Sequence, residues 1–467
     1  MNKALNKEIL RLAIPSILAN LTVPMVGMVD TAVAGHLTGG EAAAFIGGIS
    51  IGSMLFSLLY WGFGFLRTGT GGLTAQAFGR RDREDQARIL YRGVAISLII
   101  AAALLLIQWP FVKLTLLLVN ASPEVEALAS QYFFIRIWAA PATLSLMAFS
   151  GWFVGMQDSM SSMWKDFIVN GVNIPASLIL SLGIGGWKGL GFPGVALGTV
   201  IAQYSGLLFC ICVCLVKYRK SVFAGRRLSE IKGVLSGSDM RHFFKMNLDL
   251  LGRSAGFIAI YIGYTAIAAR FGDIHLACSS IMMQLLMIFS YFTDGFAYAG
   301  EALTGRFIGE KDNMMLRATV KYVFAWSMGI GTLFIGIYAL TGEPMIRLMT
   351  SDESVISACC AFIPWLAVMP PLGCAAFTWD GIYLGATDSR RIRNAMLGAA
   401  VAFFAVWLGC RAGFILTRTG TAGFSAMLDS IGGEACLHLL LAAYFAHLLF
   451  RTVYLTWRYP RSPWLTQ

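Results

Sequence analysis

The chain has 467 residues, of which 57% are hydrophobic and only 13% are charged, and its net charge is +11. A soluble domain carries roughly 25% charged residues, so a mean hydropathy of +0.68 indicates a membrane protein without a large soluble domain. Because no soluble basic domain is present, the positive charge does not indicate nucleic-acid binding.

Apolar segments long enough to cross a bilayer recur along the whole chain. A helix needs about 20 apolar residues to cross roughly 30 Å of hydrocarbon. Twelve segments are predicted to do so, at 9–37, 45–70, 90–112, 126–150, 162–185, 190–216, 243–270, 276–302, 317–340, 356–386, 394–416 and 422–450. The predicted fold is therefore an all-α polytopic membrane protein with twelve transmembrane helices. Residues 1–11 carry both charges and run into a span too long for a signal-peptide core, so no cleavable signal is expected.

The second half of the chain repeats the first at a constant offset of 230 residues. The matched pairs are Leu73-Thr74 and Leu303-Thr304, Gly79 and Gly309, Asp82 and Asp312, Pro141 and Pro371, Gly151 and Gly381, Gly155 and Gly385, and Asp158-Ser159 and Asp388-Ser389. Such a repeat predicts two six-helix lobes, at 1–216 and 243–467, related by an internal pseudo-two-fold axis. A basic cytoplasmic linker at 217–242 is expected to join them. This architecture is typical of transporters, which place their binding site between the two copies.

The distribution of lysine and arginine predicts the orientation in the membrane. If the N-terminus is cytoplasmic, 27 of the 36 lysine and arginine residues fall on the cytoplasmic side and 4 on the outer side. The remaining five lie within predicted spans: Arg67, Arg136, Arg253, Arg270 and Arg411. This asymmetry follows the positive-inside rule. It predicts a multi-pass protein of the cytoplasmic membrane with both termini in the cytoplasm and the lipid bilayer as its surroundings.

Asp30 is the clearest candidate for a functional residue, because it lies in the otherwise uncharged stretch 23–37. A charge in hydrocarbon costs at least roughly 2.5–3.5 kcal/mol on insertion scales, so an acid there is a functional candidate by default. No lysine or arginine is near Asp30 in the sequence, and burial favours the protonated form of such a carboxyl. We expect Asp30 to bind a proton; the alternative is a hydrogen bond to a neighbouring hydroxyl or backbone group.

The fifth span carries a polar stripe that is expected to accompany Asp30. Asn170, Asn173 and Ser177 are three and four residues apart, which places them on one face of a helix. Pro175 frees a backbone carbonyl that a cation or a water could use. Ser177 lies eight residues before Gly185, near the predicted outer end. These side chains are predicted to form the ion-coupling site with Asp30, the alternative being a stripe that joins two helices.

Two charged residues near the inner end of the seventh span are predicted to form a structural pair. Asp249 and Arg253 are four residues apart, a spacing that allows contact on a helix. Removing either partner would leave the other poorly compensated at the membrane boundary.

Three further acids of the second half are candidates for a substrate cavity. Asp294 and Glu301 are seven residues apart in the inner half of the eighth span. Asp380 follows Pro370-Pro371, which are expected to break or kink the tenth span. Each acid is expected to meet a cationic solute, the alternative being a hydrogen bond between helices.

No pattern of residues indicates catalysis or a resident metal. The nine cysteines and five histidines form neither a metal-binding spacing nor an HExxH motif. Gly69, Gly71 and Gly72 follow no predicted strand, so close helix packing is expected there rather than a phosphate loop. The chain is not expected to be an enzyme or to hold a cofactor.

Several runs of residues together resemble a known family. They are Val29-Asp30-Thr31 with Gly35-His36-Leu37, Gly72 to Gly79, Asn247 with Asp249 and Arg253-Ser254, Asp294 to Ala299 with Glu301, and Asp380-Gly381 through Gly385-Ala386-Thr387 to Arg393-Asn394. In these runs the chain resembles the multidrug and toxic compound extrusion (MATE) transporters, most closely their DinF-like branch. The resemblance extends over essentially the whole chain.

The resemblance implies two lobes around a central cavity and cation-coupled export of amphipathic, often cationic compounds. It also implies that Asp30 is the proton- or sodium-responsive acid of the first lobe and that Asn173 accompanies it. Members of this branch often carry a second aspartate four residues after that asparagine, where this chain has Ser177. A single titrating carboxyl favours the proton as coupling ion, with sodium as the alternative.

The predicted function is a proton-coupled antiporter that exports organic compounds or drugs by alternating access. Proton and cationic solute would compete for the charge of Asp30, which is sufficient for exchange. One alternative is a lipid-linked precursor flippase, which would require a strongly cationic cavity. Another is a non-transporting scaffold or receptor, which would leave the duplication unexplained. The expected partner is a small organic solute, nucleic acid is not expected as a partner, and the protein is expected to be a monomer.

Overall fold

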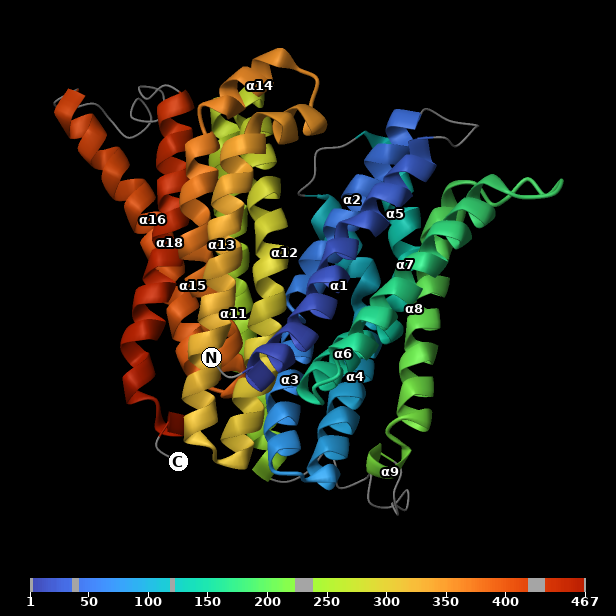
Figure 1. The fold of residues 1–467 in the computed structure, drawn as a ribbon. Helices are drawn as coiled ribbons and strands as arrows, with labels where there is room; N and C mark the ends of the chain where they lie inside the picture. The colour runs from blue at the N-terminus through green and yellow to red at the C-terminus, as the bar shows by residue number, and fades with distance from the viewer. Residues whose placement is uncertain (1–2, 36–41, 118–121, 223–237, 419–432, 466–467) are drawn as a thin grey trace. The chain divides into compact units, whose positions relative to one another are not determined.

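The computed structural model describes residues 3–35, 42–117, 122–222, 238–418 and 433–465, and within them it is built of helices (Figure 1). Ten helical stretches are long and apolar enough to cross a membrane. The bent pair α14 (Glu353–Cys360) and α15 (Ile363–Gly385) adds an eleventh. The helix α7 (Ser159–Leu182), with 24 residues, occupies the position of the fifth predicted span. The prediction of an all-α polytopic membrane protein is confirmed.

The described chain forms two compact units. The N-unit contains Arg11–Asn247 and Gly305–Glu310, and the C-unit contains Met1–Leu10, Leu248–Thr304 and Lys311–Gln467. Part of the predicted basic linker, from 223 to 237, lies outside the described residues.

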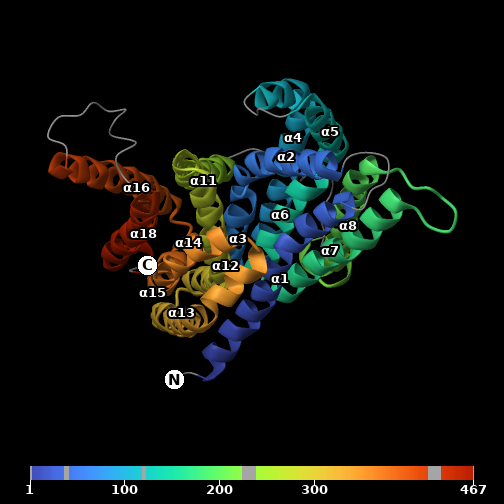
Figure 2. The same cartoon turned by 90° about the horizontal axis from the view of Figure 1, so that it is seen from above.

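The N-unit holds the first six predicted spans. Its helices are α1 (Lys3–Gly35, from Arg11 onward), α2 (Ala42–Trp61), α3 (Phe65–Gly79), α4 (Arg83–Leu116), α5 (Pro123–Arg136), η1 (Ile137–Ala139), α6 (Ala140–Gly155), α7, α8 (Phe192–Val216) and α9 (Arg219–Val222). The pair α2–α3 forms one span and α5 with α6 forms another. Figure 2 shows α7 and α8 packed against each other, with α1 beside α7. Pro175 lies inside α7, which continues through it.

The C-unit holds the remaining spans. Its helices are α11 (Ser238–Ala268), α12 (Asp273–Glu310), α13 (Asn313–Met349), α14, α15, α16 (Ser389–Arg418), α18 (Gly433–Arg458), η3 (Tyr459–Arg461) and η4 (Pro463–Leu465). The helix α15 runs through Pro370-Pro371, and the 53° bend lies before it, between α14 and α15. The break expected at the two prolines is therefore wrong in position, because a packed transmembrane helix can accommodate proline. The start of the predicted span 422–450 lies outside the described residues, and α18 ends eight residues later than predicted, at Arg458.

Glycines at repeat-related positions let helices cross at backbone contact. A Cβ added at Gly151 on α6 would lie 2.0 Å from the carbonyl oxygen of Arg67 on α3. A Cβ added at Gly381 on α15 would lie 2.1 Å from the carbonyl oxygen of Ala297 on α12. Gly381 and Ala297 lie 230 residues after Gly151 and Arg67, so the two crossings are related by the sequence repeat. The repeat in the sequence is thus a repeat of helix crossings that only glycine allows.

Four tight turns between helices share one backbone motif. Each contains a non-glycine residue with positive φ: Arg81 (58°), Gln157 (61°), Lys311 (59°) and Thr387 (55°). An aspartate follows in every case: Asp82, Asp158, Asp312 and Asp388. In the first three turns the aspartate side chain accepts a hydrogen bond from a backbone N–H three residues later and so caps the next helix. Sequence repeats at these positions therefore mark turn chemistry rather than a binding motif.

In the N-unit, the aspartate of the turn before α7 also binds the chain that follows α8. The Oδ2 atom of Asp158 accepts hydrogen bonds from Lys217 Nζ at 2.7 Å, Tyr218 OH at 2.8 Å and Ser161 Oγ at 2.6 Å. Burial by itself raises the pKa of this carboxyl, but the ammonium and the hydroxyls outweigh burial and hold the pKa below its ordinary value of 3.8. The pKa is lower in the folded chain, so the contribution to stability is complete above pH 3.8 and is lost as the pH falls through the lower value.

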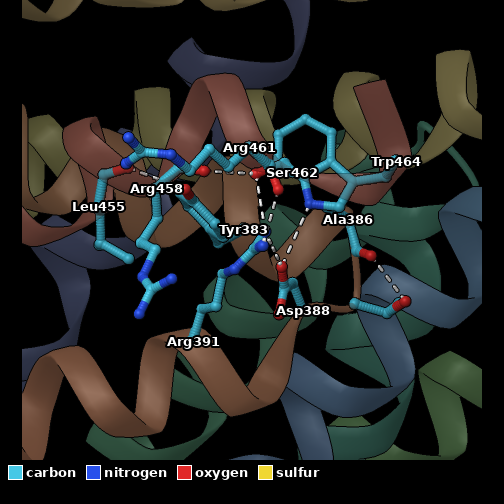
Figure 3. A network of polar contacts seen from close by, with 10 residues as sticks. Tyr383, Ala386, Asp388, Arg391, Leu455, Arg458, Arg461, Ser462 and Trp464 are labelled. Carbon is cyan, nitrogen blue, oxygen red and sulfur yellow. Dashed lines mark hydrogen bonds and ion pairs between the residues drawn. The ribbon is translucent and has the colours of Figure 1, made fainter. Parts of the chain in front are cut away.

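The C-unit repeats this connection with different side chains (Figure 3). Arg391 Nη1 donates to Asp388 Oδ2 at 2.8 Å and to Ser462 Oγ at 2.8 Å, and Trp464 Nε1 donates to Asp388 Oδ2 at 3.3 Å. Arg391 Nη2 also reaches the carbonyl oxygen of Arg461 at 2.9 Å. In the N-unit the residues after α8, and in the C-unit the residues after α18, therefore bond to the aspartate network of an earlier turn.

Replacing Gly151 with alanine should destabilise the N-unit, because the new Cβ would lie 2.0 Å from a backbone oxygen and the helices would have to separate. Overpacking of this kind costs about 1–3 kcal/mol. Gly171→Ala on α7 is the matched control, since its Cβ meets nothing within 4 Å. Thermal unfolding of both purified variants in one detergent measures the difference. Equal melting temperatures would contradict the close crossing.

Asp158→Asn should lower the free energy of unfolding by about 1–2 kcal/mol, because the amide cannot replace the acceptor of Lys217 and Tyr218. Asparagine caps helices about as well as aspartate, so the cap itself is kept. Asp82→Asn is the control, because Asp82 has a cap but lies in an exposed turn. Detergent unfolding at pH 7 should separate the two variants. A loss of the same size in Asp82→Asn would assign the effect to capping alone.

Candidate functional site

Four helices of the N-unit converge on Asp30. Its side chain lies on α1 and is 1% exposed. Asn173 and Ser177 reach it from α7, and Thr199 reaches it from α8; none of the three is more than 1% exposed. Tyr132, also completely buried, approaches from α5. The predicted association of Asp30 with the polar stripe of α7 is present in the fold, although what the group does there stays a prediction.

The carboxyl of Asp30 is held by neutral hydroxyl groups. Tyr132 OH and Thr199 Oγ1 donate to Asp30 Oδ2 at 3.2 and 3.3 Å, and Ser177 Oγ donates to Oδ1 at 3.5 Å. These hydrogen bonds are longer than the roughly 2.5–2.7 Å of a strong hydroxyl–carboxylate bond. The enclosure therefore offers polar contacts from three helices without a direct ion pair to Asp30.

Asn173 supports the hydroxyl groups and does not bond to Asp30 itself. Its Nδ2 atom donates to Thr199 Oγ1 at 3.1 Å and to Ser177 Oγ at 3.4 Å. Its Oδ1 atom is buried and has no hydrogen-bond partner. An unused acceptor beside a buried carboxyl is a place where a proton donor, a water or a cation would gain a contact.

Arg136 is connected to the carboxyl of Asp30 through one intervening side chain, that of Tyr132. Arg136, one helical turn after Tyr132 on α5, donates from Nη1 to Tyr132 OH at 2.7 Å, and its guanidinium lies 4.9 Å from the ring centre of Phe56. The hydroxyl of Tyr132 thus connects Arg136 to Asp30. Sequence reasoning found no cation for Asp30 because 106 residues separate the two side chains. The four-residue spacing of Tyr132 and Arg136 indicates that the two side chains share a helix face, but it does not indicate which acid they contact.

Asn170 was grouped with this site and lies apart from it. Its Nδ2 atom donates to the backbone oxygen of Thr22 on α1 at 3.3 Å. Thr22 lies eight residues before Asp30, which is about 12 Å along a helix. Of the stripe on α7, Ser177 bonds to the carboxyl directly and Asn173 is connected to it through Ser177 and Thr199. Asn170 thus has no direct bond to Asp30, and its part in ion coupling stays a prediction.

In the C-unit, Asp380 is bound by two arginines from different helices. Its Oδ2 atom accepts from Arg253 Nη2 on α11 at 2.9 Å and from Arg451 Nη2 on α18 at 2.6 Å. The sequence placed Arg451 in the cytoplasmic tail, whereas α18 continues past it and leaves its side chain 2% exposed. Asp380 is therefore compensated by two guanidinium groups, and these three side chains together carry a net charge of +1. The contact of Asp380 with a cationic solute stays a prediction.

Asp249 and Arg253 do not form the predicted pair. Asp249 accepts from Arg393 Nη1 and, at 3.0 Å, from Ser389 Oγ, both on α16, while Arg253 binds Asp380. The four-residue spacing permits contact along the helix, but each side chain points to a neighbouring helix that offers a better-placed partner. The single pair expected within α11 is replaced by two connections between helices.

The remaining acids of the predicted substrate cavity lie on α12. Asp294 is half-buried and Glu301 is 0% exposed. Glu301 follows Ala297, whose carbonyl meets Gly381, by one helical turn. Their contact with a solute stays a prediction. In the described parts of the chain, no three His, Cys, Asp or Glu side chains are grouped as metal ligands would be.

Comparison with known proteins bears on the whole chain. The MatE family model matches residues 15–179 and 254–407. The chain is 32% identical to DNA damage-inducible protein F of Escherichia coli strain K12, over 86% of this chain and 87% of that protein. It is 25% identical to the probable multidrug resistance protein NorM of Photorhabdus laumondii, over 88% of each. Its fold is similar to an outward-facing multidrug resistance MATE family transporter of the MOP superfamily, with a TM-score of 0.81 and 18% identity over 99% of this chain and 97% of that chain.

A double-mutant cycle should give a coupling energy of about 1–2 kcal/mol between Asp249 and Arg393, because they share a partly buried ion pair. The corresponding cycle between Asp249 and Arg253 should be additive within roughly 0.5 kcal/mol. Alanine variants and the two double variants are compared by unfolding in detergent. Stronger coupling in the second cycle than in the first would restore the pair within α11.

Proposed function

The chain belongs to the MatE family of membrane transporters, and we propose that it exports an amphipathic organic solute in exchange for protons. The positive-inside distribution supports a cytoplasmic membrane location with both termini in the cytoplasm: 26 basic residues stand against 4 once the buried Arg451 is left out. The name of the NorM relative, a probable multidrug resistance protein, supports drug-like compounds as solutes. We expect a monomer to carry out the exchange.

The observation that carries the proposal is a buried carboxyl enclosed by three hydroxyl donors from different helices. Asp30 can accept from all three when ionised. A proton on Asp30 removes the charge that these hydroxyls stabilise, and the ties from α1 to α5, α7 and α8 weaken together. Protonation of Asp30 would thereby change the contacts among four helices.

A weakened enclosure would allow α1 to move, since Pro15 and Pro24 lie inside this helix and each removes a backbone hydrogen bond. Protonation and solute binding would then favour different conformations of α1. Coupling requires this difference in affinity between conformations, because a ligand that binds both equally shifts nothing.

The proton is the proposed coupling ion, and sodium is the second candidate. The hydroxyls donate toward Asp30, an arrangement that suits a carboxyl gaining and losing a proton. A sodium ion would need several oxygen ligands, and the hydroxyls would have to turn their hydrogen atoms away. The unused Oδ1 atom of Asn173 is the specific observation that favours sodium.

Asp30→Asn should abolish export driven by a proton gradient while leaving folding intact, because the amide keeps the shape but cannot change its charge. The measurement is solute efflux in vesicles with an imposed pH difference. Asp352→Asn, at an exposed helix cap, is the matched control and should export like wild type. Normal export by Asp30→Asn with the pH dependence of wild type would refute the role given to Asp30.

The same vesicles decide the ion. At equal pH on both sides, a sodium gradient should drive no export by the wild-type protein. Export that proceeds under these conditions and stops when sodium is removed would replace the proton with sodium. Thr199→Val, which removes a hydroxyl needed as a sodium ligand, should then lose export more completely than under a proton gradient.

A further inference from the structure

Two arginines of the C-unit bind one carboxylate, Asp380, and outnumber it in charge. One oxygen of Asp380 receives both guanidinium groups, at 2.9 Å from Arg253 and 2.6 Å from Arg451. The side chains of Asp380 and Arg451 are 9% and 2% exposed, so bulk water contributes little compensation. A structural ion pair needs one arginine, and the second leaves a net positive charge inside a transmembrane bundle, where charge is costly.

The two arginines also keep unused donors. The Nε–H groups of Arg253 and Arg451 are both buried and have no hydrogen-bond partner. Each guanidinium carries five N–H donors in a planar fork, which matches the oxygens of a carboxylate or a phosphate. Only one nitrogen of each arginine is used on Asp380. The unmet donors can be satisfied by an oxygen acceptor, and the surplus charge favours an acceptor that carries a negative charge.

The arginines differ in how a ligand could reach them. Arg451 is 2% exposed and lies 5.5 Å from the ring centre of Phe377, so it is fixed within the helix packing. Arg253 is 25% exposed on its side chain and is the accessible member. The buried Arg451–Asp380 pair is neutral by itself, and the charge that remains belongs in effect to Arg253.

We infer that this group is an anion-binding site, in which Arg253 binds the acidic group of an amphipathic solute while Arg451 and Asp380 hold it in place. The inference deepens the proposed function, on which it rests, by assigning an acidic group to the solute. A monoanion on Arg253 makes the site neutral, and its two oxygens satisfy donors that are otherwise unpaired. The acidic group is a carboxylate of a free organic acid or the phosphate of a lipid headgroup, which share this chemistry.

Binding of a fluorescent alkyl carboxylate tests the site without a gradient. The purified protein in phosphatidylcholine nanodiscs is titrated with dansylaminoundecanoic acid and, separately, with its methyl ester. The acid should bind wild type roughly tenfold or more tightly than the ester, and Arg253→Gln should remove this preference. Arg253→Gln leaves the Arg451–Asp380 pair intact, so the variant should fold. Arg270→Gln, which removes an exposed arginine beyond the other end of the same helix, is the matched control and should bind like wild type.

Two results overturn the inference: equal affinities for acid and ester in wild type, or unchanged affinity for the acid in folded Arg253→Gln. Adding phosphatidylglycerol to the nanodiscs separates the two sources of the anion. Phosphatidylglycerol differs from phosphatidylcholine in that its headgroup phosphate is not balanced by a cation. Competition with the acid in wild type would identify the phosphate of an anionic lipid as ligand, and absence of competition would identify a free acid; both support an anion site. Asp30→Asn should bind the acid normally and fail only in export. If wild type shows no preference for the acid but exports its solute normally, the anion site is refuted and the proposed function is not. If wild type shows no gradient-driven export, the proposed function is refuted.

Discussion

A charge inside hydrocarbon must be compensated by groups of the protein, and the described helices are joined according to this constraint. Asp30 is compensated by hydroxyls from three helices, and Asp380 by arginines from two. Asp249 on α11 is compensated by Arg393 on α16. In every case the partner comes from another helix, so each buried acid connects elements that are distant in the sequence. Removing such an acid therefore changes helix packing as well as charge.

Glycine brings other pairs of helices in the two units to backbone contact. Where Gly151 meets Arg67 and Gly381 meets Ala297, no side chain separates the helices. The aspartates of the turns, Asp158 among them, tie the ends of helices within each unit. Because the glycine crossings and the capped turns hold the backbone, a ligand would act mainly on the charged groups around Asp30 and Asp380.

The two centres carry opposite chemistry although the sequence repeats. In the N-unit a single carboxyl faces hydroxyls and has a cation only through Tyr132. In the C-unit a carboxyl is outnumbered by two arginines. Duplication has kept the glycines and the turn aspartates, which hold the backbone, whereas Asp30 and Asp380 lie at positions that the repeat does not relate. A fixed framework with different charges at its two centres suits a proton site in one unit and an anion site in the other.

The sequence by itself determined the helical class, the internal repeat and the grouping of Asp30 with the polar side chains Asn173 and Ser177. These follow from local rules. The length of an apolar segment shows whether it can cross the membrane, helical spacing shows which residues share a face, and a charge in an apolar segment needs a compensating partner. Only the tertiary structure decided the partners. Arg136 reaches Asp30 through Tyr132, Arg451 belongs to a buried centre rather than to a tail, and Asp249 chooses Arg393 over Arg253. The reason is physical: spacing along one helix states which contacts are permitted, but packing against other helices determines which of them has the lowest free energy.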